Sequence, residues 1–345
     1  MINPVTSLLI FSIICILGYL FFYPKKGWFW KLKSGLKTDN KTLIEDILKK
    51  LYHAENSGAS IQINDITSSL DISPKKVVDA ILTMEASELI SSSKGSLKLE
   101  KEGVAYALKI IRVHRLWERY LSEKTGFHKK DWHELAEDME HKLDVTQTDE
   151  LARTLGNPRF DPHGDPIPTA AGEIKEIYGK PLSSFPEGTI GRIVHIEDEP
   201  DIIYRQILAQ DLHIGSLVRV LDSNKKRIVF YSEGEESILA PIVAGNITLS
   251  ELKKEETISE NTSRLSSLKV GESAKIIGIS RECRGEIRRR LLDLGFVINT
   301  EIKIDIESPM KNPRAYFIRN TSIAIRNEQA KFILIEKNSQ HGKAS

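Results

Sequence analysis

The feature that most constrains the fold is an internal repeat in the second half of the chain. Residues 182–193 and 265–276 both begin Leu-Ser-Ser and place a glycine and an isoleucine at the same spacing. Each copy continues into a short helical segment and then into short strand-like stretches. A repeat of this kind indicates two copies of one structural unit. We therefore predict two small β-barrels, at residues 180–252 and 262–338.

The first half of the chain carries helical periodicity instead. The spacing of apolar residues predicts helices at 42–55, 66–70 and 74–86. Ser73 and Pro74 suit the N-cap and the first position of the third helix. Two apolar stretches on either side of a turn at Gly95 come next. Three helices followed by a hairpin predict a winged helix-turn-helix domain over residues 42–104.

A second helical region follows, which we assign to residues 105–170. We expect a long helix at 102–124 and another at 131–148. Asp131 and Glu134 are spaced as in a capping box at the start of the second helix. Residues 157–168 contain four prolines and should be irregular. The chain is thus predicted to be an α+β multidomain protein.

An uncharged apolar run occupies the amino-terminal end, from Val5 to Tyr23. A membrane-spanning helix needs about 20 such residues. The aromatic and basic residues after it are typical of the cytoplasmic end of a span; they are Lys25, Lys26, Trp28, Phe29, Trp30, Lys31 and Lys33. We expect a transmembrane anchor at residues 1–24 and a linker at 25–41. The protein would be a single-pass protein of the cell inner membrane with cytoplasmic C-terminal domains. The alternative is a cleaved or buried segment.

Composition excludes some classes of protein. The net charge is +1, whereas broad charge-driven nucleic-acid binding requires a strongly basic domain. Cys15 and Cys283 lie in unlike surroundings, so a disulfide framework is not expected.

The sequence lacks a Gly-rich phosphate loop and a Gly-x-Ser-x-Gly motif, and His133-Glu134 is not followed by the second histidine of a zincin. We therefore do not expect an enzyme.

Potential metal ligands cluster on two of the predicted helices. Glu137, Glu140 and His141 share one helical face, because positions i, i+3 and i+4 are neighbours. The other candidates are His133 on the same face, and His114 with Glu118 four positions apart on the preceding helix. Nitrogen and oxygen donors without sulfur suit Mn²⁺, Fe²⁺, Co²⁺ or Zn²⁺. The alternative is a solvated, charged helix face.

From about residue 42 to residue 168 the chain resembles the DtxR/MntR family of metal-dependent repressors. The motifs that carry the resemblance are His114-Arg115-Leu116 with Glu118, the series His133, Glu137, Glu140 and His141, and Pro162 to Pro168. The resemblance implies a helical domain for dimerisation and metal binding. It also implies a primary metal site with a manganese-type ligand set, formed by Asp46, His114, Glu137, Glu140 and His141.

The chain departs from the family pattern at two places. Lys49 stands where manganese-type members have a second carboxylate on the first helix, which favours one metal over two. Glu118 and His133, with His114, are candidates for an ancillary metal. The barrel ligands of that site would fall near Pro200 and Ile203, which cannot bind metal, although Glu199 and Asp201 are close.

The two C-terminal modules, 180–252 and 262–338, resemble FeoA domains, most clearly at Arg289 to Phe296 in the second module. The resemblance implies that both are SH3-like barrels. For DNA binding, the candidates are Lys75 and Lys76 on the predicted recognition helix and Lys94 in the wing; these lysines could equally be solvated surface. The expected function is a dimeric, metal-dependent DNA-binding regulator of transcription, with Mn²⁺ or Fe²⁺ as cofactor and operator DNA as partner. The alternative is a membrane accessory protein that senses cytoplasmic metal for a metal transporter without binding DNA.

Overall fold

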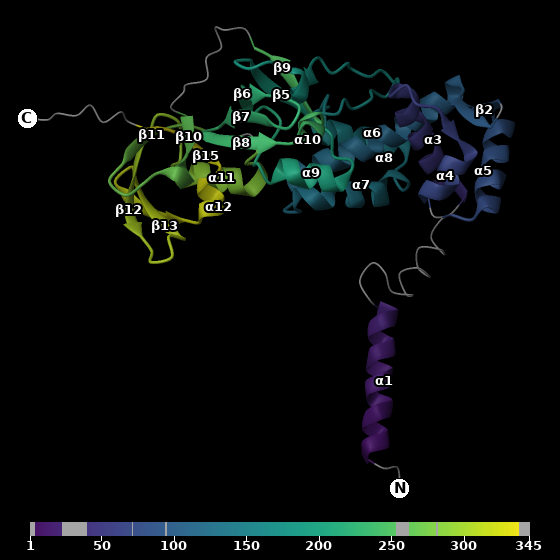
Figure 1. The fold of residues 1–345 in the computed structure, drawn as a ribbon, viewed down its shortest axis with the longest axis horizontal. Coiled ribbons are helices and arrows are strands. Elements are labelled where there is room, and N and C mark those ends of the chain that lie inside the picture. Colours follow the sequence, from purple (N-terminus) through teal and green to yellow (C-terminus); the bar gives the residue numbers. More distant parts are fainter. Residues whose placement is uncertain are drawn as a thin grey trace, which may run out of the picture. The chain divides into compact units, whose positions relative to one another are not determined.

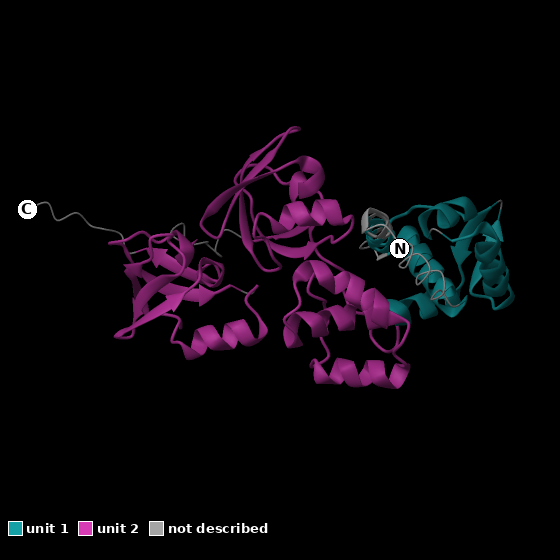
Figure 2. Ribbon diagram, turned by 90° about the horizontal axis from the view of Figure 1, so that it is seen from below, with its two compact units in different colours: residues 1–111 teal, residues 112–345 magenta. Residues whose placement is uncertain are grey.

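The computed structural model describes residues 4–22, 40–70, 72–93, 95–252, 262–280 and 282–337. The chain divides into two compact units, Met1–Ile111 and Arg112–Ser345, called here the first and second unit (Figure 2). The boundary falls inside the long helix α6 (Lys101–Lys124). Each unit is described by itself.

The apolar run near the amino terminus forms helix α1 (Pro4–Phe22) (Figure 1). In the parts of the chain that the structure describes, no helix is both long and apolar enough to cross a membrane. The predicted transmembrane helix is therefore not supported. The aromatic and basic residues from Lys25 to Lys33, on which the prediction also relied, lie outside the described residues.

Between residue 40 and α6, the described part of the first unit contains three helices and a small sheet. These elements are α3 (Asn40–Asn56), β1 (Ile61–Gln62), α4 (Ile63–Leu70), α5 (Pro74–Ala86), β2 (Ile90–Ser93) and β3 (Ser96–Leu99). The strand order is β1-β3-β2. Helix α3 buries Leu43, Ile47, Leu48 and Leu51, which recur at helical spacing on one face. Ser73 lies at the N-cap of α5, but its side chain makes no capping hydrogen bond.

The helical part of the second unit differs from the prediction. After α6 come η1 (Lys129–Asp131), α7 (Trp132–Glu140) and α8 (Val145–Thr154). The single helix predicted at 131–148 is wrong, because Asp144 accepts a hydrogen bond from the Gln147 N–H and starts a new helix with a full capping box. The capping box predicted at Asp131 is also wrong. The 3-10 turn η1 runs directly into α7, so Asp131 has a helical backbone and its side chain caps nothing.

Two six-stranded sheets follow, and the internal repeat of the sequence falls on them. The first has the order β4-β9-β5-β6-β7-β8, and the second has the equivalent order β10-β15-β11-β12-β13-β14. The strands of the first are β4 (Lys180–Pro181), β5 (Ile190–Ile196), β6 (Leu217–Ser223), β7 (Ile228–Ser232), β8 (Glu235–Leu239) and β9 (Ile247–Glu251). Those of the second are β10 (Thr262–Arg264), β11 (Ser273–Ile279), β12 (Glu301–Glu307), β13 (Arg314–Ile318), β14 (Thr321–Ile325) and β15 (Ile333–Lys337).

Short helices accompany the strands of both sheets at equivalent positions. They are η2 (Leu182–Ser184), α9 (Asp201–Leu208) and α10 (Pro241–Ala244) in the first, and η3 (Leu265–Ser267), α11 (Gly285–Asp293) and α12 (Asn327–Ala330) in the second. Each sheet closes over its own apolar core, around Phe230 in the first and around Phe296 and Tyr316 in the second. The two cores are separate, so contacts between the sheets are made by other residues.

One such contact is the turn between β7 and β8. Gly234 has a φ of +94°, and a Cβ at this position would lie 2.5 Å from the Cα of Ser263. Only glycine adopts this backbone conformation without strain while allowing the second sheet so close. The turn therefore requires a glycine for two separate reasons.

We expect Gly234→Ala to destabilise the protein by more than Gly188→Ala. Gly188 also has a positive φ, of +82°, but a Cβ there meets nothing within 4 Å. Gly188→Ala thus measures the backbone strain alone, on the order of 1 kcal/mol, and Gly234→Ala adds the steric overlap. Urea denaturation of both variants tests this expectation, and equal losses would contradict it.

Candidate metal centre

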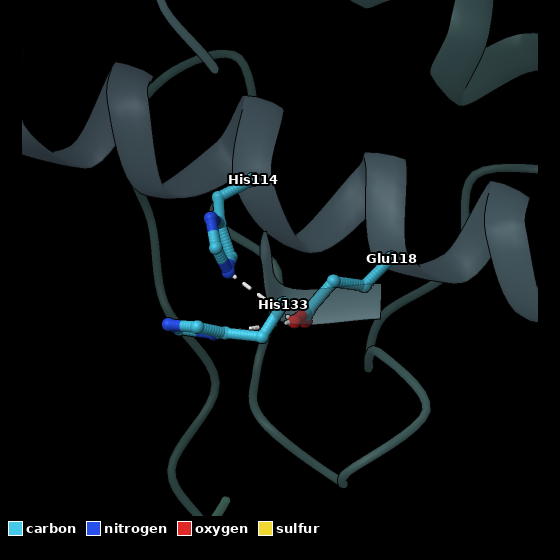
Figure 3. A group of neighbouring side chains, drawn as sticks. All are labelled: His114, Glu118 and His133. Atoms are coloured by element: carbon cyan, nitrogen blue, oxygen red, sulfur yellow. Dashed lines mark ion pairs between the residues drawn. The ribbon is translucent and has the colours of Figure 1, made fainter. Parts of the chain in front are cut away.

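The site begins on one face of α6. His114 and Glu118 are four residues apart, so their side chains project side by side from this helix (Figure 3). The Nε2 atom of His114 lies 3.2 Å from Oε1 of Glu118. Both residues are buried, with exposures of 6% and 2%. A buried carboxylate is costly unless charged or hydrogen-bonding groups compensate it, and the rest of the site supplies such groups.

Helix α7 adds His133 to this pair. Its Nδ1 atom lies 3.7 Å from Oε1 of Glu118, and Figure 3 shows its ring beneath the two side chains of α6. The ligand atoms of His114, Glu118 and His133 all lie within 4.8 Å of one another. The structure thus brings together three residues that the sequence analysis considered for an ancillary metal.

Two further residues complete the cluster, and the sequence analysis did not propose either as a ligand. Nε2 of His163 lies 3.8 Å from Oε1 of Glu118. Oδ2 of Asp198 lies 3.4 Å from Nδ1 of His133 and 3.9 Å from Nε2 of His163. His163 stands in the Pro-rich motif, and Asp198 in the acidic stretch before α9, so both carried a sequence signal. Neither could be placed beside α6 without the tertiary fold.

Hydrogen bonds outside the cluster orient two of its histidines. Nδ1 of His114 lies 2.5 Å from Oε2 of Glu140, and Nδ1 of His163 lies 3.2 Å from the hydroxyl of Tyr204 on α9. In each case the other ring nitrogen faces Glu118. This arrangement, in which a second group fixes the tautomer of the imidazole, is typical of histidines that bind metals.

The free polar atoms of the cluster match what a cation requires. Oε1 of Glu118, Nδ1 of His133 and Nε2 of His163 are buried, and none of them has a hydrogen-bond partner within the described part of the chain. Buried polar atoms without partners are rare because each costs about 1–3 kcal/mol. Three imidazoles and two carboxylates form a ligand set suited to Mn²⁺, Fe²⁺, Co²⁺ or Zn²⁺. The residues therefore fit a divalent metal.

The pKa shifts within the cluster also suit a site for a cation. Burial acts to raise the pKa of Glu118, but the charges of His114 and His163 and the close approach of the His114 and His133 rings outweigh it and lower the pKa well below its usual range. Burial acts to lower the pKa of His133. Its ring contacts with Asp198 and then with Glu118, Glu137 and Glu199 outweigh burial and raise the pKa far above its usual value. The raised pKa of His133 places a positive charge beside the carboxylates of the cluster, at the position where a cation would bind.

The residues predicted for the primary metal site are distributed over both units. Asp46 lies on α3 in the first unit, and the other four lie in the second. His141 is the C-cap of α7, and its Nε2 atom lies 3.6 Å from Oε1 of Glu140. Glu137 is half-exposed, and its Oε1 atom lies 3.4 Å from Nε2 of His133. The joining of all five around one metal stays a prediction.

The other predicted residues are placed as follows. Lys75 and Lys76 are exposed on the first turn of α5, whereas Lys94 lies outside the described residues. Of the acidic residues near Pro200, Glu199 lies 3.3 Å from Nε2 of His133. Asp201 instead pairs with Arg205, 2.8 Å away on the same helix. The barrel contribution to the ancillary cluster therefore comes from the residues just before Pro200.

Comparisons with known proteins agree with this description. Residues 100–169 match the metal-binding and dimerisation domain of iron-dependent repressors, and residues 263–337 match the FeoA domain. A solved manganese-dependent transcriptional repressor in complex with manganese aligns over 61% of this chain and 100% of its own, with 25% identity and a TM-score of 0.55. The chain is thus related to the DtxR/IdeR family of metal-dependent repressors, which confirms the resemblance, and it carries a FeoA domain.

Curated relatives fall into two kinds. The diphtheria toxin repressor of Corynebacterium jeikeium is 33% identical over 125 residues, which cover 36% of this chain and 52% of that protein. A probable metal transport system membrane protein of Chlamydia trachomatis is 41% identical over 80 residues, which cover 23% of this chain and 18% of that protein. The chain therefore spans about half or less of the length of these two relatives.

Proposed function

We propose that the protein is a metal-dependent, DNA-binding regulator of transcription that responds to Mn²⁺ or Fe²⁺. The observation that carries this proposal is the convergence of His114, Glu118, His133, His163 and Asp198 on buried atoms without hydrogen-bond partners. The likeness to a manganese-dependent repressor supports it. The matched domain is that of iron-dependent repressors and the aligned structure is a manganese-dependent repressor, so the proposal covers both metals.

The residues of the cluster would couple metal binding to the arrangement of the second unit. His114 and Glu118 come from α6, His133 from α7, and Asp198 from the segment before α9. A cation held by all of them would link the helical domain to the first sheet domain. A ligand shifts a conformational equilibrium by its difference in affinity for the two states. We propose that metal binding stabilises a dimer whose recognition helices reach operator DNA.

We expect the purified protein to bind its own upstream DNA more tightly when Mn²⁺ is present. The double variant Lys75→Ala/Lys76→Ala should weaken binding on all sequences and reduce the salt slope of log K by about 2, since each phosphate contact contributes about 0.9. Lys109→Ala is the matched control, because Lys109 is also exposed but lies on α6. Electrophoretic mobility shifts over a salt series measure both effects. The absence of any metal-dependent shift would count against a DNA-binding regulator.

The second candidate function is an accessory protein of a metal transporter, which senses metal without binding DNA. The observation that favours it is the 41% identity to part of a chlamydial protein named as a probable metal transport system membrane protein. Co-purification with a metal permease, together with no DNA binding, would decide for this function. Location at the inner face of the cell membrane, predicted from residues 5–33, stays a prediction for either function.

A further inference from the structure

A cavity in the second unit, apart from the metal cluster, is lined mainly by basic side chains. Its volume is about 700 Å³, within the roughly 300–1,000 Å³ of small-molecule sites. Five cationic side chains and one carboxylate line it; the cations are Arg119, Lys124, Arg284, Arg288 and Arg289, and the carboxylate is Glu123. A concave surface with this excess of positive charge concentrates anions.

The first turn of α11 adds backbone donors to the same cavity. The first N–H groups of a helix have no partner within the helix, and the N-cap residue Arg284 provides no side-chain acceptor for them. Gly285 has a φ of +58°, and a Cβ there would lie 3.3 Å from the carbonyl oxygen of Glu123 on α6. Glycine thus lets α11 begin close to the end of α6. Helix N-termini attract anions through these N–H groups and the helix dipole.

Arg119 forms an ion pair through Nη2 with Glu123 on the same helix. Nε of Arg119 is buried and lacks a hydrogen-bond partner among the described residues. Nη1 of Arg284 donates to the hydroxyl of Ser122 over 3.3 Å. Burial and then the charge of Arg119 lower the pKa of Arg284, although Glu123 and Glu282 act in the opposite direction. An anion bound between Arg119 and Arg284 would satisfy the buried N–H and reduce their repulsion.

We propose that this cavity binds a small anion that carries one or more phosphoryl groups. Five cations less one carboxylate leave four positive charges, which favours a multivalent anion over a monocarboxylate. Arginine forks bind phosphate oxygens in a bidentate manner, and the α11 N–H groups suit a further oxygen. None of the residues that line the cavity belongs to the metal cluster, so failure of metal binding would leave this inference standing.

Isothermal titration calorimetry of the full-length protein at fixed ionic strength tests this inference. The probes are inorganic phosphate, pyrophosphate and a nucleoside diphosphate. Pyrophosphate should bind more tightly than phosphate, because it engages more of the cations. Comparison with the nucleoside diphosphate shows whether the phosphoryl group is free or part of an organic molecule.

The double variant Lys124→Gln/Arg289→Gln should weaken binding of pyrophosphate about ten-fold or more, since both side chains line the cavity and each charge-assisted contact is substantial. Both residues are exposed, so the variant should fold, which circular dichroism verifies. Arg290→Gln is the control, because Arg290 is exposed on α11 but does not line the cavity. No binding by the unmodified protein, or an equal loss in the control, would overturn the proposal.

Discussion

Replacing Glu118 with glutamine is expected to lower the affinity of the second unit for Mn²⁺ or Zn²⁺ by more than about 100-fold. Oε1 of Glu118 lies within 4 Å of His114, His133 and His163, so this one atom contacts all three histidines of the cluster. Loss of an outer-shell partner alone costs roughly 10–100-fold in metal affinity. The change removes a charged ligand while keeping the size of the side chain.

Asp138→Asn is the matched control for this variant. Asp138 is exposed on α7, and the change removes the same charge without removing a residue of the cluster. Equilibrium dialysis with metal analysis measures the affinity of both variants. If Glu118→Gln bound metal as tightly as the control, the cluster around Glu118 would not be a metal site. If Glu118→Gln still bound metal at a second, weaker site, substitutions at Glu140 and His141 would show whether those residues form it.

The candidate site was predicted from the sequence only as far as helical spacing reaches. His114 with Glu118, and His133 with Glu137, are i and i+4 pairs, and their proximity follows from the helix alone. His163 and Asp198 come from irregular segments that lie 35 positions apart in the sequence, and no local rule places either residue beside α6. The orienting contact of Tyr204 with His163 is also a product of tertiary packing.

The prediction of the fold was correct for the repeated modules and wrong for the end of one helix. The repeat at 182–193 and 265–276 predicted two equivalent modules, and the two sheets indeed share one strand order. The end of α7 was missed although its signal was local, since Asp144 and Gln147 have the spacing of a capping box. As a result His141, predicted inside a helix, is its C-cap.

The second large effect is expected at the contact between the two sheets. Arg264 in β10 donates from Nη2 to Oε2 of Glu233 over 2.9 Å, with side-chain exposures of 5% and 10%. His213 lies 2.8 Å from the other carboxylate oxygen. Arg264→Met should destabilise the protein by about 3 kcal/mol at neutral pH, because removal of one partner leaves a buried charge without its counterion. Urea denaturation followed by circular dichroism measures this loss.

The double variant Glu233→Gln/Arg264→Met should recover part of that loss, since it leaves no uncompensated charge. Arg227→Met is the control. Arg227 pairs with Asp222 at exposures of 57% and 41%, and such surface pairs contribute about 0–1 kcal/mol. If the control and Arg264→Met lost equal stability, the buried pair would not hold the two sheets together.

The pH dependence of the stability of these variants follows from the carboxyl group of Glu233. Burial acts to raise the pKa of Glu233, but the hydrogen bond and charge of His213 and the charge of Arg264 outweigh it and lower the pKa below its usual value. A lowered pKa contributes stability that is present above the unfolded value, about 4.3, and is lost as the pH falls through the folded value. The difference in stability between the unmodified protein and Arg264→Met should therefore be full at pH 6 and shrink below about pH 4. A difference that grew on acidification would show that Arg264 acts through packing instead of through the charge of Glu233.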